Sequence, residues 1–465
     1  MAPSAEVDEI TITSKALTLS PNTQYWVEKR AQHVRGGFPA FPVAVESAKG
    51  HIITDVDGKD YIDFISQFAV MNFGYSHPNI TKAAVDQIYK MPLSGTAHIS
   101  PLYAQFAERI TKKFGFDSIV TMLSGSEAVE SAVKIARKWA YTKKNIPENE
   151  AWILTTDQCY HGLTLATMPL ATVVAKNFGQ HVPKVGPFTP TGDKLIQYGD
   201  IDILAETFKQ DGHRIAAFLV EAVQGWAGLV YGGVDSFYPS TRFPPKGYLK
   251  AVQDLCKEHN ILLIFDEVQA GYGRTGKDLS YQHAEGVQPD MVTLGKAVTG
   301  DRERADLEPG FYPMSVVMGK SHVMDVVQKS EILSTFGACP VACAVALAAL
   351  DVLEEEKISE RTHRLGLLLE KTLKELNPPH VIELRGGGLF YSLVIDESTA
   401  GVTARRAAAL TTLRGVLVGC GFNRLRFSPP LTITEEDLVK AIRVISQALR
   451  DIEYLGDFPG SEVIN

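Results

Sequence analysis

Short apolar runs alternate with amphipathic stretches through the middle of the chain. The runs are rich in β-favouring residues and occupy 119–123, 152–154, 216–220, 261–265, 291–294 and 314–318. From residue 126 to about Tyr141, by contrast, apolar residues recur every three or four positions, which is typical of a helix with one buried face. Strands that alternate with helices in this way predict an α/β fold with a mostly parallel sheet and right-handed crossovers.

The two ends of the chain show a different pattern. Between Val43 and Phe64, apolar and polar residues alternate around Asp57-Gly58, which predicts a meander with a hairpin turn. Before it, residues 1–24 are polar without periodicity, so we expect a mobile lead-in there. Other short elements follow from the same pattern. We expect helices at 25–35, 78–89, 341–356 and 435–454, and strands at 381–384, 389–395 and 424–427.

Charged residues stand at the ends of two of the central strands. The run at 261–265 is followed directly by Asp266-Glu267, and the run at 291–294 by Gly295-Lys296. Ligands of open α/β sheets bind beyond the carboxyl ends of the strands. Pyridoxal phosphate needs a lysine that holds its aldehyde and an aspartate that keeps its pyridine nitrogen protonated. These strand ends therefore indicate a pyridoxal phosphate site built on Asp266 and Lys296.

Three other interpretations compete for the same residues. The segment 271–277 fits the P-loop pattern, but Asp278 stands where a magnesium-binding hydroxyl belongs, and the loop follows the acidic strand. The same glycines match a dinucleotide-binding motif, yet residues 266–270 separate them from the strand. The third interpretation is a solvent-exposed Lys296 after an edge strand, which these residues alone leave open.

A candidate phosphate site precedes these strands. Ser124-Gly125-Ser126 turns the strand at 119–123 into the following helix. Small residues at a helix N-terminus leave backbone N–H groups free for an anion, and the helix dipole adds to the attraction. A plain helix cap is the alternative, and the position of the turn one βα unit ahead of Asp266 and Lys296 favours the phosphate.

Three motifs in order resemble those of the class III aminotransferases, a fold-type I group that includes ornithine and 4-aminobutyrate aminotransferases. They are Phe265-Asp266-Glu267-Val268-Gln269, Gly273-Arg274-Thr275-Gly276 and Gly295-Lys296-Ala297, and similarity runs from about Pro42 to the last helix. The resemblance implies a large cofactor-binding domain at 78–336. It also implies a smaller α+β domain built from both chain ends, 25–77 and 337–465.

The resemblance also implies which residues contact the cofactor. Tyr160 and Val268 are expected on opposite faces of the pyridine ring, and Gln269 on the ring oxygen. Thr335 is expected to reach the phosphate of a neighbouring subunit, which requires a homodimer with shared active sites. The full expected set comprises Ser124, Gly125, Ser126, Tyr160, His161, Glu221, Asp266, Val268, Gln269, Lys296, Ser334 and Thr335. His161 is expected to be structural, and Glu221 to lie behind the residues in contact.

The expected substrate pocket departs from that of ornithine aminotransferases. Arg426 matches the arginine that clamps an α-carboxylate. Leu163 stands where a second carboxylate-binding arginine is found, and Trp226 where a glutamate masks the clamp. Phe38 and Phe68 take the place of two tyrosines. Because each difference removes a polar group, we expect an apolar substrate body and poor use of ornithine.

Two insertions follow sheet strands on the active-site side, at 231–243 and 301–310. Arg242, in the first, is the visible residue that offers a replacement charge.

The resemblance leaves the reaction open between several chemistries. Transamination between an amino acid or amine and a keto acid, aldehyde or ketone is the principal expectation. Racemisation, decarboxylation, an aminomutase reaction and ornithine aminotransferase activity proper remain alternatives. A catalytically dead binding protein is disfavoured, because Lys296, Asp266 and the phosphate turn are all present.

Composition narrows the partners. The net charge of −8 and the sequence pI near 5.9 argue against nucleic acid or an anionic membrane as partner. The longest apolar stretch, 341–350, is too short to span a bilayer. Five cysteines without metal-ligand spacing favour a reducing compartment and give no metal site. Residues 1–6 lack signal-peptide features, so a cytoplasmic enzyme acting on small molecules is expected.

Overall fold

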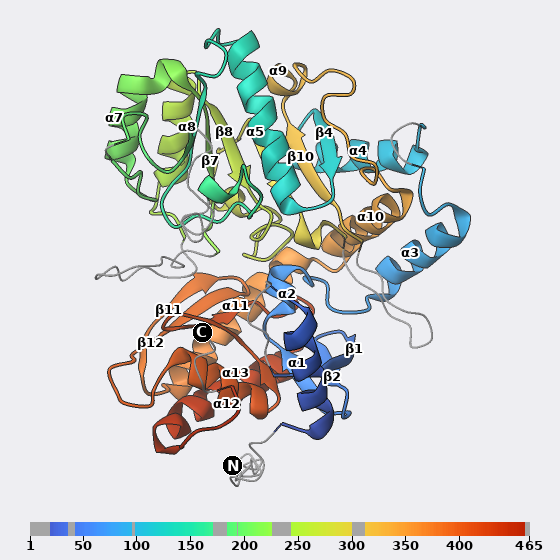
Figure 1. The fold of residues 1–465 in the computed structure, drawn as a ribbon, viewed down its shortest axis with the longest axis vertical. Coiled ribbons are helices and arrows are strands. Elements are labelled where there is room, and N and C mark those ends of the chain that lie inside the picture. The colour runs from blue at the N-terminus through green and yellow to red at the C-terminus, as the bar shows by residue number, and fades with distance from the viewer. Residues whose placement is uncertain are drawn as a thin grey trace.

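The computed structural model describes residues 19–35, 42–94, 98–170, 184–192, 194–225, 243–299 and 312–460. The chain forms two lobes, and Figure 1 shows the middle of the sequence in the upper lobe and both chain ends together in the lower one. Among the described helices, none is long and apolar enough to cross a membrane.

The upper lobe is built on a sheet of seven described strands in the order β4-β10-β9-β8-β7-β5-β6. The strands β5 to β9 pair in parallel, and β10 is antiparallel to both of its neighbours, β4 and β9. The strands are β4 (Ser118–Met122), β5 (Trp152–Leu154), β6 (Val185–Gly186), β7 (Ile215–Val220), β8 (Leu262–Asp266), β9 (Met291–Leu294) and β10 (Ser315–Gly319).

Helices cover this sheet on both faces, as expected for parallel strands that are buried throughout. Both β7 and β8 are buried at every position, which explains their continuous apolar sequences. The helices are α3 (Pro78–Lys90), α4 (Pro101–Phe114), α5 (Gly125–Thr142), α7 (Ile201–Asp211), α8 (Tyr248–Glu258), α9 (Ser321–Met324) and α10 (Pro340–Glu355). Short 3₁₀ turns lie between them: η2 (Met168–Leu170), η3 (Gly212–Arg214), η4 (Ser280–His283) and η5 (Lys296–Thr299).

The lower lobe contains two four-stranded sheets. One joins the chain ends, because β13 pairs in parallel with β3 in the order β1-β2-β3-β13. The other is antiparallel, in the order β11-β12-β15-β14. The strands are β1 (Val45–Lys49), β2 (Ile52–Asp55), β3 (Asp60–Asp63), β11 (Val381–Gly387), β12 (Phe390–Ile395), β13 (Val416–Leu417), β14 (Gly419–Gly421) and β15 (Arg424–Phe427).

The helices of the lower lobe are α1 (Pro21–His33), α2 (Ser66–Ala69), α11 (Ile358–Leu376), α12 (Ala404–Leu413) and α13 (Glu435–Asp451), which continues into η6 (Ile452–Tyr454). The first begins at Pro21, four residues before the expected Tyr25. Ser20 caps it by accepting a hydrogen bond from the Thr23 N–H, and a proline suits the first helical position. Residues 21–24 therefore belong to the helix and not to the lead-in.

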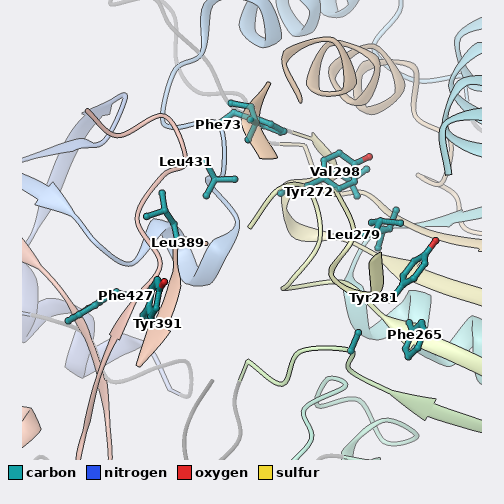
Figure 2. Close-up of a cluster of buried hydrophobic side chains, with 14 of the residues drawn as sticks. Phe73, Phe265, Tyr272, Leu279, Tyr281, Val298, Leu389, Tyr391, Phe427 and Leu431 are labelled. Atoms are coloured by element: carbon teal, nitrogen blue, oxygen red, sulfur yellow. The ribbon is translucent and has the colours of Figure 1, made fainter. Parts of the chain in front are cut away.

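A single hydrophobic cluster runs through both lobes. Figure 2 shows Phe265 and Tyr281 on the sheet side, Phe427 and Tyr391 on the lower-lobe side, and Tyr272 between them. Phe265 and Tyr281 stack with ring centroids 5.4 Å apart. The two lobes thus share one core, and the predicted α/β fold with a mostly parallel sheet and a smaller α+β part is confirmed.

Candidate active site

The two residues predicted to carry the chemistry lie at the same edge of the central sheet. Asp266 is the last residue of β8 and pairs with Thr293 on β9. Lys296 follows β9 after one glycine and opens η5 with a φ of 44°. Left-handed backbone at a residue other than glycine carries a conformational cost, which the surrounding structure must offset. Parallel pairing of β8 with β9 thus sets both side chains beyond neighbouring carboxyl ends.

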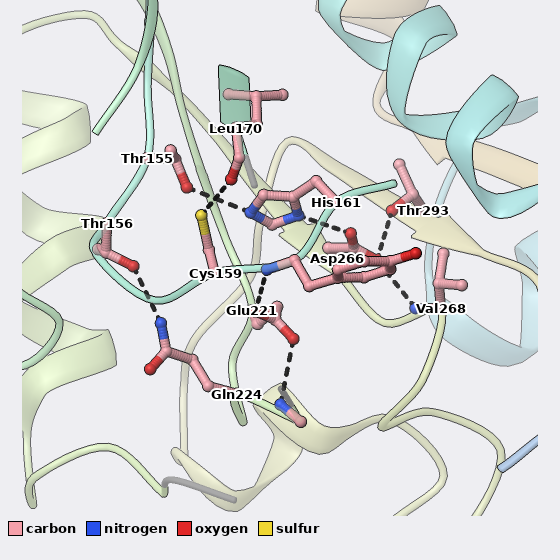
Figure 3. A network of polar contacts seen from close by, with 12 residues as sticks. Thr155, Thr156, Cys159, His161, Leu170, Glu221, Gln224, Asp266, Val268 and Thr293 are labelled. Atoms are coloured by element: carbon pink, nitrogen blue, oxygen red, sulfur yellow. Dashed lines mark hydrogen bonds and ion pairs between the residues drawn. The ribbon is translucent and has the colours of Figure 1, made fainter. Parts of the chain in front are cut away.

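The carboxylate of Asp266 is buried and held from three sides (Figure 3). His161 Nδ1 lies 2.7 Å from Oδ2, while the Val268 N–H and the Thr293 hydroxyl donate to Oδ1 at 3.0 and 3.2 Å. Burial lowers the pKa of His161, but Cys159 and Asp266 together raise this pKa well above its ordinary value. The imidazole therefore favours its charged form, and its bond to Thr155 at 3.2 Å fixes the ring.

Glu267 faces away from this site. Its oxygens accept bonds from the Ser280 N–H, the Ser280 hydroxyl and the Tyr281 N–H at 2.7 to 2.8 Å. Successive side chains of a strand point to opposite faces, so β8 aims only Asp266 at Lys296. Both carboxylates thus stand at the carboxyl end of β8, as the sequence predicts, and Glu267 fixes the turn at η4.

The amine of Lys296 has neighbours of both charges. Burial lowers its pKa, the carboxylates of Asp266 and Glu221 raise it, and the guanidinium of Arg426 lowers it, with a net lowering. An amine with a lowered pKa is more often neutral near pH 7, which is the form that attacks an aldehyde or accepts a proton.

Glu221 directly follows β7, and its charge acts on Lys296. Its oxygens accept from the Tyr160 N–H at 3.2 Å and the Gly225 N–H at 3.1 Å. Burial raises the pKa of Glu221 to about 7; Asp266 adds to this rise, and His161 opposes it. Glu221 thus supports the backbone of Tyr160. The side chain of Tyr160 is half-buried, and burial and the charge of Asp266 both raise its pKa.

The turn at 124–126 shows the helix cap directly. Ser124 caps α5, since its hydroxyl accepts from the Glu127 N–H while Glu127 accepts from the Ser124 N–H. Its side chain is therefore occupied by the helix. The N–H groups of Gly125 and Ser126, at the first positions of α5, have no partner in the helix and remain suitable for a phosphate.

Glycines let three segments meet closely around this turn. A Cβ on Gly125 would lie 2.6 Å from Val268 Cγ1, and one on Gly295 would lie 3.3 Å from the same atom. At Gly162, where φ is 113°, a Cβ would lie 2.1 Å from Ser126 Oγ. The glycine backbone beside Val268 leaves room for a flat ring. Together with the acid of Asp266 and the amine of Lys296, this arrangement fits pyridoxal phosphate.

Gln269 and Phe68 join the two lobes at the site. The amide of Gln269 donates to the carbonyl of Phe68 at 3.1 Å, and a Cβ on Gly225 would lie 2.1 Å from Gln269 Oε1. Phe68 belongs to α2, whose four residues all have left-handed φ between 44° and 66°.

The structure describes four of the remaining predicted residues. Arg426 donates to the Gly225 carbonyl at 2.6 Å, and Leu163 is 50% exposed. Ser334 is partly buried and Thr335 is exposed. Phe38, Trp226, Arg242 and the insertion at 301–310 lie outside the described residues, as does 231–243 apart from Phe243.

Sequence reasoning quoted Arg274 within a motif but gave it no role. Arg274 is fully buried, and its guanidinium donates to Asn72 Oδ1, to Ser66 Oγ and to the carbonyls of Leu389 and Pro429. It therefore ties the turn after β8 to both chain ends. A lone arginine between glycines in an otherwise buried segment was the available signal.

Comparison with known proteins adds independent information. A family model described as aminotransferase class-III matches residues 35–449. The ornithine aminotransferase of Emericella nidulans is 39% identical over 438 residues, covering 93% of this chain and 92% of that protein. The ornithine aminotransferase of Toxoplasma gondii superposes with a TM-score of 0.82 at 32% identity, covering 93% of this chain and 96% of that one. An acetylornithine aminotransferase from Elizabethkingia anophelis gives 0.78 at 35% identity, covering 93% and 100%.

Proposed function

The chain belongs to the class III aminotransferases, which use pyridoxal phosphate, and we propose that this member transfers an amino group between a donor with an apolar body and a keto acid, aldehyde or ketone. The family predicted from the motifs is thus confirmed. The observation that carries the proposal is the buried carboxylate of Asp266 beside an amine of lowered pKa at Lys296.

The residues divide the work in the following way. When bound, pyridoxal phosphate supplies an electron sink that stabilises negative charge on the substrate carbon. Asp266, held by His161, would face the pyridine nitrogen, and the N–H groups of Gly125 and Ser126 would hold the phosphate. Lys296 would hold the aldehyde at rest. During the reaction, the neutral amine of Lys296 would accept the proton of the substrate carbon.

Substrate choice is proposed from the residues around the opening. Arg426 would bind the carboxylate of a substrate. Burial lowers the pKa of Arg426 to about 10, the carboxylate of Glu221 opposes this fall, and the charge of Arg424 adds to it. Leu163 presents a half-exposed apolar side chain where related enzymes offer an arginine. The backbone carbonyl of Phe68 accepts a hydrogen bond from Gln269. A substrate with its anionic group at one end and an apolar body suits this arrangement.

A homodimer with shared active sites is part of the proposal. Thr335 is exposed, and two exposed apolar side chains flank it, Leu333 at 58% and Phe336 at 53%. Cys339 Sγ donates to the Pro92 carbonyl at 3.1 Å, so the end of α3 lies beside this loop. The end of α3 and the chain just after it expose further large apolar side chains: Ile88, Tyr89, Met91, Leu93 and Ile99. An apolar surface of this extent favours burial against a second copy.

A cytoplasmic location is proposed on the state of the cysteines. All five are free thiols, and four of them are buried. Buried unpaired thiols are ordinary in proteins of reducing compartments.

The reaction and the substrate class are tested together by rapid-mixing spectra of the holoenzyme with a panel of amines. We expect apolar amino acids or amines to convert the bound cofactor to pyridoxamine phosphate, and a keto acid to restore it. Ornithine should be slower by roughly ten- to a hundredfold, because a lost hydrogen bond to a charged group costs about 1.5–3 kcal/mol.

Two results would contradict the proposal. Turnover without pyridoxamine phosphate and without a keto acid would assign the chain to racemisation, decarboxylation or an aminomutase reaction. Ornithine conversion as fast as that of apolar donors would overturn the proposed substrate class and favour an ornithine aminotransferase.

A further inference from the structure

Three arginines lie on one face of the sheet β11-β12-β15-β14. Arg385 on β11 pairs with Ser392 on β12, and Ser392 pairs in turn with Arg426 on β15. Arg424 stands two residues before Arg426 and therefore points to the same face. The residues between and after them, Leu425 and Phe427, point into the core on the other face.

Two of these arginines have an acid nearby. Arg385 forms an ion pair with Glu383 of its own strand. Arg426 lies within charge range of Glu221 and donates to the Gly225 carbonyl.

Arg424 has no such acid among the described residues. It is 6% exposed, its Nε is buried without a hydrogen-bond acceptor, and the charge that acts on it is the like charge of Arg385. Burial and Arg385 together lower its pKa to about 10, so the guanidinium stays charged at neutral pH. Buried charges in proteins are normally paired, and an unpaired one is costly. The described residues thus leave the buried charge of Arg424 without an anion.

The register places Arg424 farther from the cofactor than Arg426. Gly225 lies next to Phe390, the first residue of β12, because a Cβ on Gly225 would lie 2.8 Å from Phe390 Cζ. Arg426 pairs with Ser392 and Arg424 with Val394, two residues further along. From the reacting amine outward, a substrate therefore meets Arg426 before Arg424.

We propose that Arg424 and Arg426 form a two-arginine anion subsite, which takes a substrate whose anionic end carries two negative charges, such as a pair of carboxylates. The inference rests on the proposed function, since it assigns the substrate class of the same pocket. It adds the second charge beyond the α-carboxylate clamp and leaves the apolar body on the side of Leu163 and Phe68.

The test is calorimetric titration of the holoenzyme with succinate and with butanoate, which have the same number of carbons and differ by one carboxylate. We expect succinate to bind at least about tenfold more tightly than butanoate. Arg424→Met should abolish that difference, and Arg424→Lys should retain part of it. Because no acid among the described residues pairs with Arg424, Arg424→Met should leave the melting temperature unchanged or raise it.

Other outcomes overturn the proposal. Equal binding of the two ligands by the unmodified enzyme, or an unchanged preference in Arg424→Met, removes the subsite. A lower melting temperature, or dissociation of the assembly in Arg424→Met, assigns Arg424 to structural support or to a subunit contact. If no amino donor forms pyridoxamine phosphate in the same preparation, the proposed function is contradicted. The comparison of succinate with butanoate still tests the subsite in that case.

Discussion

At Lys296, burial and the guanidinium of Arg426 lower the pKa of the amine, whereas the carboxylates of Asp266 and Glu221 raise it. The charges of Arg426 and Glu221 can be removed one at a time while Asp266 stays in place. Their effects on the amine have opposite signs, which provides a matched pair of variants.

The pH dependence of cofactor capture by the apoprotein should separate them. Only the neutral amine attacks the aldehyde, so capture should rise with pH through the pKa of Lys296, which lies below that of a free lysine. Arg426→Gln removes a repelling charge, raises this pKa and should move the midpoint to higher pH. Glu221→Gln removes an attracting charge and should move it lower. Absorbance-monitored capture at a series of pH values measures both, and shifts in the same direction would contradict the assignment.

The sequence predicts single site residues where they stand at the end of a recognisable strand. Asp266 and Lys296 followed from two apolar runs, and the direction of Glu267 follows from strand alternation. The contact of His161 with Asp266 joins positions 105 residues apart, so local pattern could not reveal it. The missing partner of Arg424 is likewise a property of three paired strands and not of the segment that contains it.

Among the elements, the turn α2 is unusual because its four residues, none of them glycine, are all left-handed. Left-handed backbone costs roughly 1–2 kcal/mol per residue, so other contacts must hold it. Asp63 accepts bonds from the Ile65 and Ser66 N–H groups, and Ser66 Oγ donates to the Ser428 carbonyl. Arg274 donates to the same Ser66 oxygen at 3.2 Å. Arg274 therefore helps to hold the Phe68 carbonyl where it accepts the hydrogen bond from Gln269.

Replacing this arginine should weaken the joint between the lobes. Arg274→Met leaves Asn72 Oδ1, Ser66 Oγ and two carbonyls without their donor in a buried site. We expect a loss of stability on the order of 3–5 kcal/mol, together with slower donor conversion because Gln269 loses its support. Urea unfolding of the holoenzyme measures the first effect. The exposed neighbour Lys277→Met is the control, and equal stability of the two variants would refute the role of Arg274.

Most elements were predictable because their patterns are strong. The strands β5, β9 and β15 have the expected bounds, and α5, α10 and α13 lie within a few residues of them. The start of α1 was misplaced because the Ser20-Pro21 cap signal was not used. The left-handed α2 could not be foreseen, since residues 66–69 contain no glycine to mark such a backbone.

At the scale of the whole molecule, the resemblance predicted that both chain ends meet in one part of the structure. The parallel pairing of β13 with β3 is the contact that realises it, and this pairing spans more than 350 residues. The common core in Figure 2 then fixes one lobe against the other. Apolar pattern alone does not specify such long-range pairing, which explains why the arrangement of the ends came from the resemblance.

Mixed assemblies should test the shared active site. One variant carries Lys296→Ala and the other Thr335→Val, which removes the exposed hydroxyl expected to serve the partner's phosphate. If each site uses Lys296 of one chain and Thr335 of the other, mixed dimers contain one site with both changes and one with neither. Co-refolded mixtures should recover up to about a quarter of the unmodified activity, since half of the dimers are mixed and each has one intact site.

The Thr335 variant must first show a clear loss of cofactor affinity by equilibrium titration, which serves as the control. Given that loss, activity of the mixture no greater than the mean of its parents would contradict a site shared between subunits.

The identity of the lysine that holds the cofactor tests the account most directly. Borohydride reduction of the holoenzyme, followed by peptide mass spectrometry, should place the pyridoxyl group on Lys296 alone. Lys296→Ala should carry no such group and should lose multiple turnover, while it still binds pyridoxal phosphate noncovalently through the turn at Gly125 and Ser126. A pyridoxyl group on another lysine, or sustained turnover by Lys296→Ala, would contradict the account.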